Sequence, residues 1–321
     1  MPSRPMSTNL IGALCAMAAA VFFSFNDMAI KFMSGGYALH QVVLIRSVVG
    51  MSVWLVLVMP FSGGWKVVKT DRLGMHILRG LCVVFANLTF FLGLAAMPLA
   101  GAVAIFFVSP LLITVFSVLF LGERVGPFRW GAIVIGFAGV LVMVNPGAGS
   151  FQIAALLPIL AATGYAFLHI LTRKIGGTES AATMLFYIQL TFIVTSILVG
   201  LVLGDGRFSG NSHPSLDFLT RAWVVPQVSD WGILVAIGVA SSGGGYLISQ
   251  AYRLSEAAFA APFEYLAMPL AILFGVLVFG EYPVFRDWVG IALIIGSGLV
   301  LLWRESVKNR PLTETAPRLR R

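Results

Sequence analysis

The sequence predicts an all-α integral membrane protein, built from ten transmembrane helices that form two inverted five-helix repeats. Three observations predict this fold. Of the 321 residues, 59% are hydrophobic and only 11% are charged, whereas soluble chains carry about 25% charged residues. Ten apolar segments divide the chain, and two stretches in its two halves match without a gap. A water-soluble protein of this composition would lack the polar side chains to cover its surface.

Ten apolar segments account for the predicted spans. Each is near the roughly 20 residues that a helix needs to cross the hydrocarbon core. All should be helical, because lipid cannot hydrogen-bond a free backbone. Turn signals such as Asn145-Pro146-Gly147 separate them. In chain order, the predicted spans are residues 10–32, 39–60, 74–96, 100–121, 128–145, 151–172, 181–204, 231–251, 257–280 and 286–303.

The basic residues predict the orientation of the chain. With the N-terminus placed in the cytoplasm, 15 of the 21 Lys and Arg residues fall on the cytoplasmic side, four fall outside and two lie within spans. Because cytoplasmic loops carry an excess of Lys and Arg, we expect both termini to be cytoplasmic. This topology explains the net charge of +8 without a nucleic-acid partner. The longest loop, residues 205–229, is then external, and residues 304–321 form a basic cytoplasmic tail.

A repeat relates the two halves of the chain. The stretch that begins at Leu99 matches the one that begins at Ala257, at a shift of 158 residues. The repeat unit is five helices, residues 9–145 and 151–303. Because five is odd, the second copy enters the membrane from the other side, an arrangement that many secondary transporters use for alternating access. The matched pairs include Gly122/Gly280, Glu123/Glu281 and Trp130/Trp288, and we expect both glutamates to play a structural part at helix ends.

The pattern resembles a known family. The stretches SPLLITVFSVLFLGERV and APFEYLAMPLAILFGVLVFGEYP, with Lys31, Arg46 and Arg79-Gly80 in the first three spans, are similar to the EamA family of the drug/metabolite transporter superfamily. Members of that family move amino acids, nucleosides, S-adenosylmethionine, riboflavin and other metabolites. The resemblance implies a secondary transporter of a small organic metabolite in the bacterial inner membrane. One departure is that Glu264 stands where the first repeat has Phe106, so the two halves are not chemically equivalent.

The resemblance leaves the substrate and the direction of transport open. It favours uptake of an amphipathic, ring-bearing metabolite such as riboflavin or S-adenosylmethionine. Export of amino acids or drug-like metabolites is an alternative of the same class. A membrane receptor or scaffold that transports nothing is an alternative of another class.

Motifs of enzymes are absent from the sequence. It contains no GxxxxGK phosphate loop and no HExxH zinc motif. The four histidines show no spacing typical of metal ligands. We therefore expect no catalytic residues, no metal and no cofactor.

Glu264 is the strongest candidate for a functional residue. It lies about nine residues into its span, roughly 13 Å deep in a core of about 30 Å. A charge at that depth normally faces a cavity or a partner, and repeat-built transporters bind substrates and coupling ions near the midplane. Glu264 could take up and release a proton during transport, or it could be a protonated side chain that only joins two helices.

A second group of charges lies near the outer face. Asp27 is near the end of the first span, beside Asn26, and Lys31 follows four residues later on the same helix face. Arg46 lies about 10 Å below the outer surface in the second span. A structural interpretation pairs Asp27 with Arg46 or Lys31. A functional one makes the group an outer gate or a contact for an anionic substrate.

Uncharged polar residues in other spans complete the candidate pathway. Each alone could be a hydrogen-bonding contact between helices, but together they would suit a central cavity. Tyr246 and Gln250 lie one turn apart and share a face. The expected partners are a small-molecule substrate and the lipid bilayer, and the sequence also allows a homodimer. The residues of this group are Asn87, Tyr165, Gln189, Tyr246 and Gln250.

Phenylalanine is frequent, at 25 of 321 residues. Phe90-Phe91 and Phe106-Phe107 could stack on a flat ring of a substrate. Most phenylalanines, however, are expected to face lipid or neighbouring helices. The pattern does not single out one ring as a ligand contact.

Overall fold

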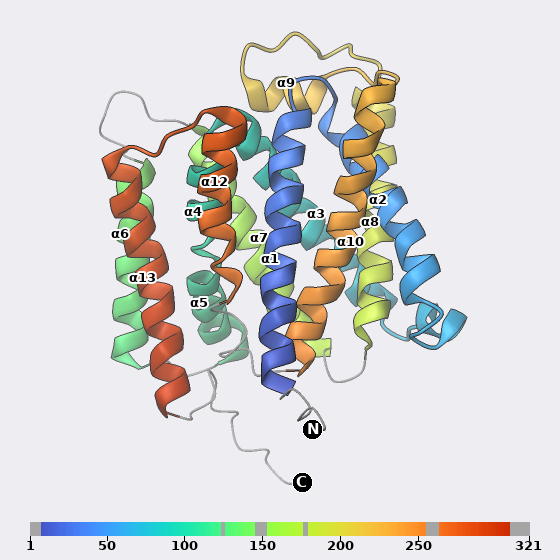
Figure 1. Ribbon diagram of the computed structural model, residues 1–321. Helices are drawn as coiled ribbons and strands as arrows, with labels where there is room; N and C mark the ends of the chain where they lie inside the picture. Colours follow the sequence, from blue (N-terminus) through green and yellow to red (C-terminus); the bar gives the residue numbers. More distant parts are fainter. Residues whose placement is uncertain (1–7, 123–125, 145–152, 176–178, 255–262, 309–321) are drawn as a thin grey trace, which may run out of the picture.

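The computed structural model describes residues 8–122, 126–144, 153–175, 179–254 and 263–308, and every regular element in these ranges is a helix (Figure 1). The first half contains α1 (Thr8–Met33), α2 (Leu39–Val53), which continues as the π-helix η1 (Trp54–Val58), η2 (Gly64–Val68), α3 (Leu73–Ala96), α4 (Leu99–Phe106), α5 (Ser109–Leu121) and α6 (Pro127–Val144). The second half contains η3 (Ile153–Ala155), α7 (Leu156–Ile175), α8 (Ala181–Leu203), α9 (Pro214–Thr220), η4 (Val228–Asp230), α10 (Trp231–Leu254), α12 (Ala267–Phe279) and α13 (Phe285–Lys308).

The structure confirms a multi-pass helical bundle. Eight helical segments of the described chain are long and apolar enough to cross a bilayer, and they coincide with the first eight predicted spans. Ala267–Phe279 is a shorter apolar helix, since the predicted ninth span begins outside the described residues. The total of ten spans therefore stays a prediction.

The long helices run along a common direction, and the start of α1 lies at the same end of the bundle as the end of α13 (Figure 1). We call this the inner end, and the opposite end, where α9 lies, the outer end. The chain thus returns to the end where it started, as two five-helix units require. The distribution of Lys and Arg predicts that the inner end is cytoplasmic.

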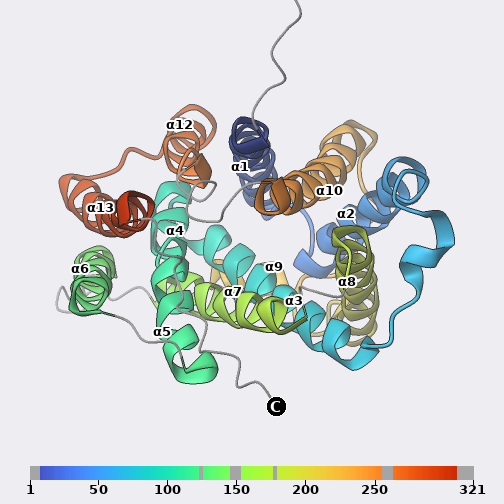
Figure 2. The same cartoon turned by 90° about the horizontal axis from the view of Figure 1, so that it is seen from below.

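The inverted repeat is visible in the packing of the helices. In the two repeats, α1 is equivalent to α7 and α3 is equivalent to α10. α1 packs along α10, and in the same way α7 packs along α3. α2 packs on its own equivalent α8, and α6 packs on its own equivalent α13. Viewed along the bundle, α6 and α13 lie at one edge, α2 and α8 at the opposite edge, and α1 and α10 face α3 and α7 between them (Figure 2). Each helix therefore has the same neighbour in one repeat as its equivalent has in the other, as a two-fold axis between the repeats requires.

The same relation holds residue by residue in the fourth and ninth spans. Residues 107–108 interrupt the helix between α4 and α5, and residues 265–266 form the matching interruption before α12, again 158 residues apart. The rings of the equivalent residues Phe107 and Tyr265 touch, with centroids 4.9 Å apart, so the two-fold axis passes between them. Gly122 and Gly280 end the two helices with φ of 68° and 66°, a left-handed conformation that favours glycine.

The contact between α6 and α13 gives the first testable prediction. A side chain at Gly139 would place its Cβ 2.9 Å from Ile294 and 3.0 Å from the carbonyl oxygen of Gly290, whereas one at Gly296 would meet nothing within 4 Å. Gly139→Leu should therefore cost about 1–3 kcal/mol through overpacking, and Gly296→Leu should leave stability unchanged or raise it. Thermal unfolding in detergent measures both, and equal melting temperatures would contradict the close approach.

Candidate functional site

An ion pair closes the outer end of the bundle. The Nζ of Lys31, at the end of α1, lies 2.9 Å from Glu281 Oε1 and donates to the carbonyl oxygens of Leu94 at 3.0 Å and Met97 at 2.6 Å. Glu281 Oε2 accepts from the backbone N–H of Leu99 at 2.8 Å. The pair thus joins α1, α3, α4 and the end of α12. Lys31 thus pairs with Glu281 and not with Asp27. Glu281 lies at a helix end as expected, its structural role stays a prediction, and Glu123 lies outside the described residues.

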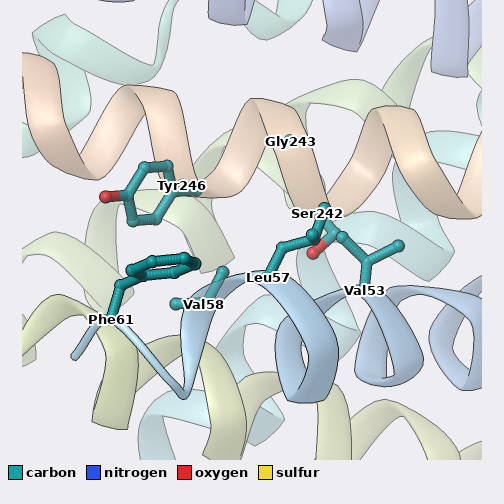
Figure 3. A pocket seen from close by; sticks show the side chains of 7 residues that line it. All are labelled: Val53, Leu57, Val58, Phe61, Ser242, Gly243 and Tyr246. Carbon is teal, nitrogen blue, oxygen red and sulfur yellow. The ribbon is translucent and has the colours of Figure 1, made fainter. Parts of the chain in front are cut away.

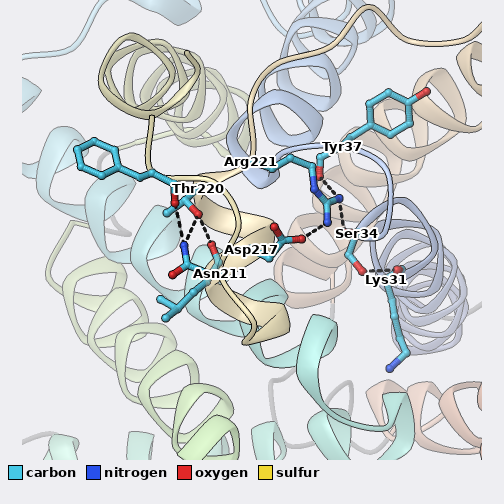
Figure 4. Close-up of polar contacts among 9 residues, drawn as sticks. Lys31, Ser34, Tyr37, Asn211, Asp217, Thr220 and Arg221 are labelled. Atoms are coloured by element: carbon cyan, nitrogen blue, oxygen red, sulfur yellow. Dashed lines mark hydrogen bonds and ion pairs between the residues drawn. The ribbon is translucent and has the colours of Figure 1, made fainter. Parts of the chain in front are cut away.

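The loop of residues 205–229, which the basic residues predict to be external, covers the same end. It contains a short helix, α9, whose Phe218 is fully buried. Arg221 pairs with Asp217 on α9 and donates to the carbonyl oxygen of Ser34 at 2.8 Å after α1 (Figure 4). Ser215 donates to the carbonyl oxygen of Leu92 in α3 at 2.6 Å. The loop therefore binds α1 and α3 together from the outside.

A tyrosine fixes the far end of this loop. The Tyr37 hydroxyl, between α1 and α2, donates to the Asp230 carboxylate and accepts from the backbone N–H of Gln227 at 3.1 Å. The hydrogen bond to Asp230 raises the pKa of Tyr37 above its ordinary value. Gln41 adds a reciprocal pair with the backbone of Val224, donating at 2.5 Å and accepting at 3.2 Å.

Arg46 lies beneath this outer closure, buried between two aromatic rings. Its side chain is 2% exposed, and its guanidinium carbon lies 4.6 Å from the ring centre of Phe192 in α8 and 5.3 Å from that of Phe91 in α3. Arg46 and Asp27 attract one another electrostatically, and the predicted ion pair between them stays a prediction. The site therefore combines a cation, an anion and two ring faces from both repeats.

Several polar atoms around Arg46 have no hydrogen-bond partner among the described residues. They are Arg46 Nε, Asn26 Oδ1 and Ser47 Oγ, all on buried side chains. Asn26 donates its amide to Asp27 Oδ1 at 3.0 Å, which leaves its own oxygen as an acceptor. An unsatisfied buried polar group costs about 1–3 kcal/mol. Of the three atoms, Arg46 Nε belongs to the site itself and is available to a polar ligand.

Glu264 lies next to the helix interruption at the two-fold axis. Its carboxyl interacts electrostatically with the hydroxyl of Tyr165 in α7. Phe106, the residue that takes the place of Glu264 in the first repeat, contacts the same tyrosine, with ring centroids 5.4 Å apart. His169 packs on the other side of Tyr165 at 4.5 Å. Two of the predicted residues, Glu264 and Tyr165, are thus brought together where the two repeats meet.

The remaining predicted residues lie elsewhere. Gln250 Nε2 donates to the Tyr246 hydroxyl at 2.7 Å, so these two share a face as expected, but Tyr246 lines a pocket on the flank between α2, η1 and α10 (Figure 3). Asn87 donates to the Val83 carbonyl oxygen of its own helix at 3.1 Å. Gln189 is buried and packs against Gly50 of α2, so that a Cβ at position 50 would have no room.

Sequence reasoning missed Phe192, and it treated Phe91 only as one ring among several. Phe192 follows Gln189 by three residues and shares its helix face, which is the signal that could have pointed to it. The structure adds the tertiary fact that the sequence lacks, namely that both rings enclose Arg46 of a third helix.

An all-helical membrane bundle with an inverted repeat, and with buried charges where the repeats meet, is typical of membrane transporters. Comparison with known proteins agrees with this class. The model of the EamA-like transporter family matches residues 10–145 and 152–303, and the chain belongs to that family.

Characterised relatives are transporters too. The chain is 29% identical over 306 residues to a riboflavin transporter of Vibrio cholerae, covering 94% of this chain and 96% of that one. It is 28% identical over 300 residues to an S-adenosylmethionine uptake transporter of Rickettsia conorii, covering 94% and 95%. A crystal structure superposes with a TM-score of 0.64 over 91% of this chain and 98% of that one, at 20% identity, which shows the fold alone.

Proposed function

We propose that this protein takes up an amphipathic, ring-bearing metabolite, with riboflavin and S-adenosylmethionine as the first candidates, across the bacterial inner membrane by alternating access. The names of the two relatives support this substrate class. The observation that carries the proposal is the Arg46 site, because a guanidinium held between two rings, with an Nε–H that has no partner among the described residues, can bind the polar edge of a flat ligand.

The position of the site supports alternating access. Arg46 and Phe91 come from the first repeat, residues 9–145, and Phe192 comes from the second, residues 151–303. Movement of one repeat against the other would therefore open or close the site. In this structure the outer end is closed by Lys31 and Glu281 and by the external loop, so entry from outside requires these contacts to separate. Both termini would be cytoplasmic, as the basic residues predict.

Transport in proteoliposomes tests the proposal. The purified protein should exchange labelled riboflavin or S-adenosylmethionine for the same unlabelled compound inside the vesicle. Arg46→Lys should raise the KM for this exchange about tenfold, because an ammonium cannot reproduce the planar guanidinium between two rings. Val48→Ala, an exposed position on the same helix, is the control. Absence of exchange with either compound and with amino acids would favour a receptor or scaffold instead.

A further inference from the structure

The connection between α2 and α3 is held firmly at the inner end of the bundle. Val67 of η2 is buried in a cluster with Trp54 and Val58 of η1. The hydroxyl of Tyr187 in α8 donates to the carbonyl oxygen of Val68 at 2.7 Å. These contacts fix the connection against α2 and α8, so its outward-facing residues keep a defined position beside the bundle.

The outward side of this connection is aromatic and basic. Phe61 is 88% exposed and Trp65 is also exposed, as aromatic residues are at the boundary between lipid tails and headgroups. The same connection carries three exposed basic residues and one exposed acidic residue, Asp71. Basic groups at this depth attract anionic headgroups. The exposed cations are Lys66, Lys69 and Arg72.

A pocket of about 250 Å³ lies between α2, η1 and α10, and Phe61 of this connection lines one side of it (Figure 3). The π-helix η1 forms one wall, with the N–H of Met59 donating to the carbonyl oxygen of Trp54 at 2.8 Å, five residues back. Leu57 is 61% exposed at the pocket, so the pocket opens on the flank that faces lipid. Its walls are mostly apolar, and its volume is below the roughly 300–1,000 Å³ of pockets that enclose whole drug-sized ligands.

Two polar side chains of α10, Ser242 and Tyr246, line this mostly apolar pocket. The Tyr246 hydroxyl accepts a hydrogen bond from Gln250, which leaves its own proton to donate, for example to an ester carbonyl. Tyr246 also packs against the cluster that holds Val67, so the pocket and the basic connection share one supporting core. A ligand with an anionic head and an apolar chain matches both features at once.

We propose that this flank binds an anionic phospholipid, with its phosphate at Lys66 and Lys69 and one acyl chain in the pocket beside Leu57. Ser242 at the pocket donates to the carbonyl oxygen of Gly50 at 3.2 Å and so joins α10 to α2. The bound chain therefore lies against a contact between the two repeats.

Native mass spectrometry of the detergent-purified protein tests the proposal. The wild-type chain should retain phosphatidylglycerol in preference to phosphatidylcholine. Lys66→Gln with Lys69→Gln should weaken phosphatidylglycerol binding about tenfold, while the matched pair Arg207→Gln with Arg286→Gln, equally exposed at the outer end, should not. All four residues are exposed, so folding is not at risk. Unchanged binding in the Lys variant would overturn the proposal.

Two further arms separate the head from the chain. Leu57→Trp should fill the pocket and lower phosphatidylglycerol binding although both lysines remain. Unchanged binding in that variant would overturn the assignment of the acyl chain. Glycerol phosphate at the same concentration should not displace the lipid, since it lacks the chain. Full displacement would show a simple phosphate site instead.

Discussion

Glu281→Gln should lower the stability of the protein by about 2–4 kcal/mol. The substitution leaves the ammonium of Lys31 without its counter-charge. The Lys31 side chain is only 10% exposed, and that of Glu281 is 24% exposed. Removal of one partner of a buried ion pair costs about 3–5 kcal/mol, and partial exposure reduces that figure. Thermal or denaturant unfolding in detergent measures the loss.

An exposed ion pair of the same chain supplies the control. Arg207 and Asp205 lie 2.7 Å apart, but their side chains are 61% and 49% exposed. Asp205→Asn should leave the melting temperature unchanged, because water already solvates both charges.

A double-mutant cycle then tests whether Lys31 and Glu281 act as a unit. Lys31→Met combined with Glu281→Gln should cost clearly less than the sum of the two single losses. Losses that add would show that the two residues stabilise the outer end independently.

The pairing of Lys31 shows what the sequence could and could not predict. The helix period placed Asp27 on the same face one turn away, and that local argument favoured the wrong partner. The true partner, Glu281, is 250 positions distant, so only the tertiary arrangement brings it to the end of α1. The repeat did single out Glu281 as a residue at a helix end, because the same Gly-Glu pair stands 158 residues earlier.

The external loop shows a different limit. Its composition is polar and mixed, and α9 is only seven residues long, too short to produce a helical hydrophobic pattern. Phe218 is buried because the loop folds back onto the ends of α2 and α3. The spans, by contrast, were predictable within a few residues, since backbone hydrogen bonding in lipid leaves helices as the only solution for apolar segments.

The candidate site could be predicted from the sequence only in part. The cost of burying a charge singled out Arg46, Asp27 and Glu264 from the sequence, and the structure gives each a charged or polar neighbour. The same reasoning could not separate Tyr246, which faces the flank, from Tyr165, which lies at the axis. Helix depth follows from the sequence, but helix rotation depends on the neighbours.

Glu264→Gln should abolish accumulation of substrate driven by a pH gradient while leaving exchange at equilibrium largely intact. An amide can keep the hydrogen bonds of a protonated carboxyl, but it cannot bind and release a proton. Glu264 is the place where such coupling would act, because it lies at the axis between the repeats beside Tyr165. If one proton moves with each substrate, a gradient of one pH unit supports an inside-to-outside substrate ratio of about ten. In the variant this ratio should stay at about one.

Two further variants serve as controls for this prediction. Glu264→Asp keeps a titratable group and should retain dependence on the pH gradient at a reduced rate. Phe106→Leu changes the equivalent position of the other repeat, which carries no proton, and should alter the rate alone. Exchange and accumulation share every step except net proton movement, so their separation in Glu264→Gln assigns coupling to this carboxyl. A variant that accumulates substrate as the wild type does would show that Glu264 only joins the two repeats, and the proton, if one moves, would have to be carried elsewhere in the bundle.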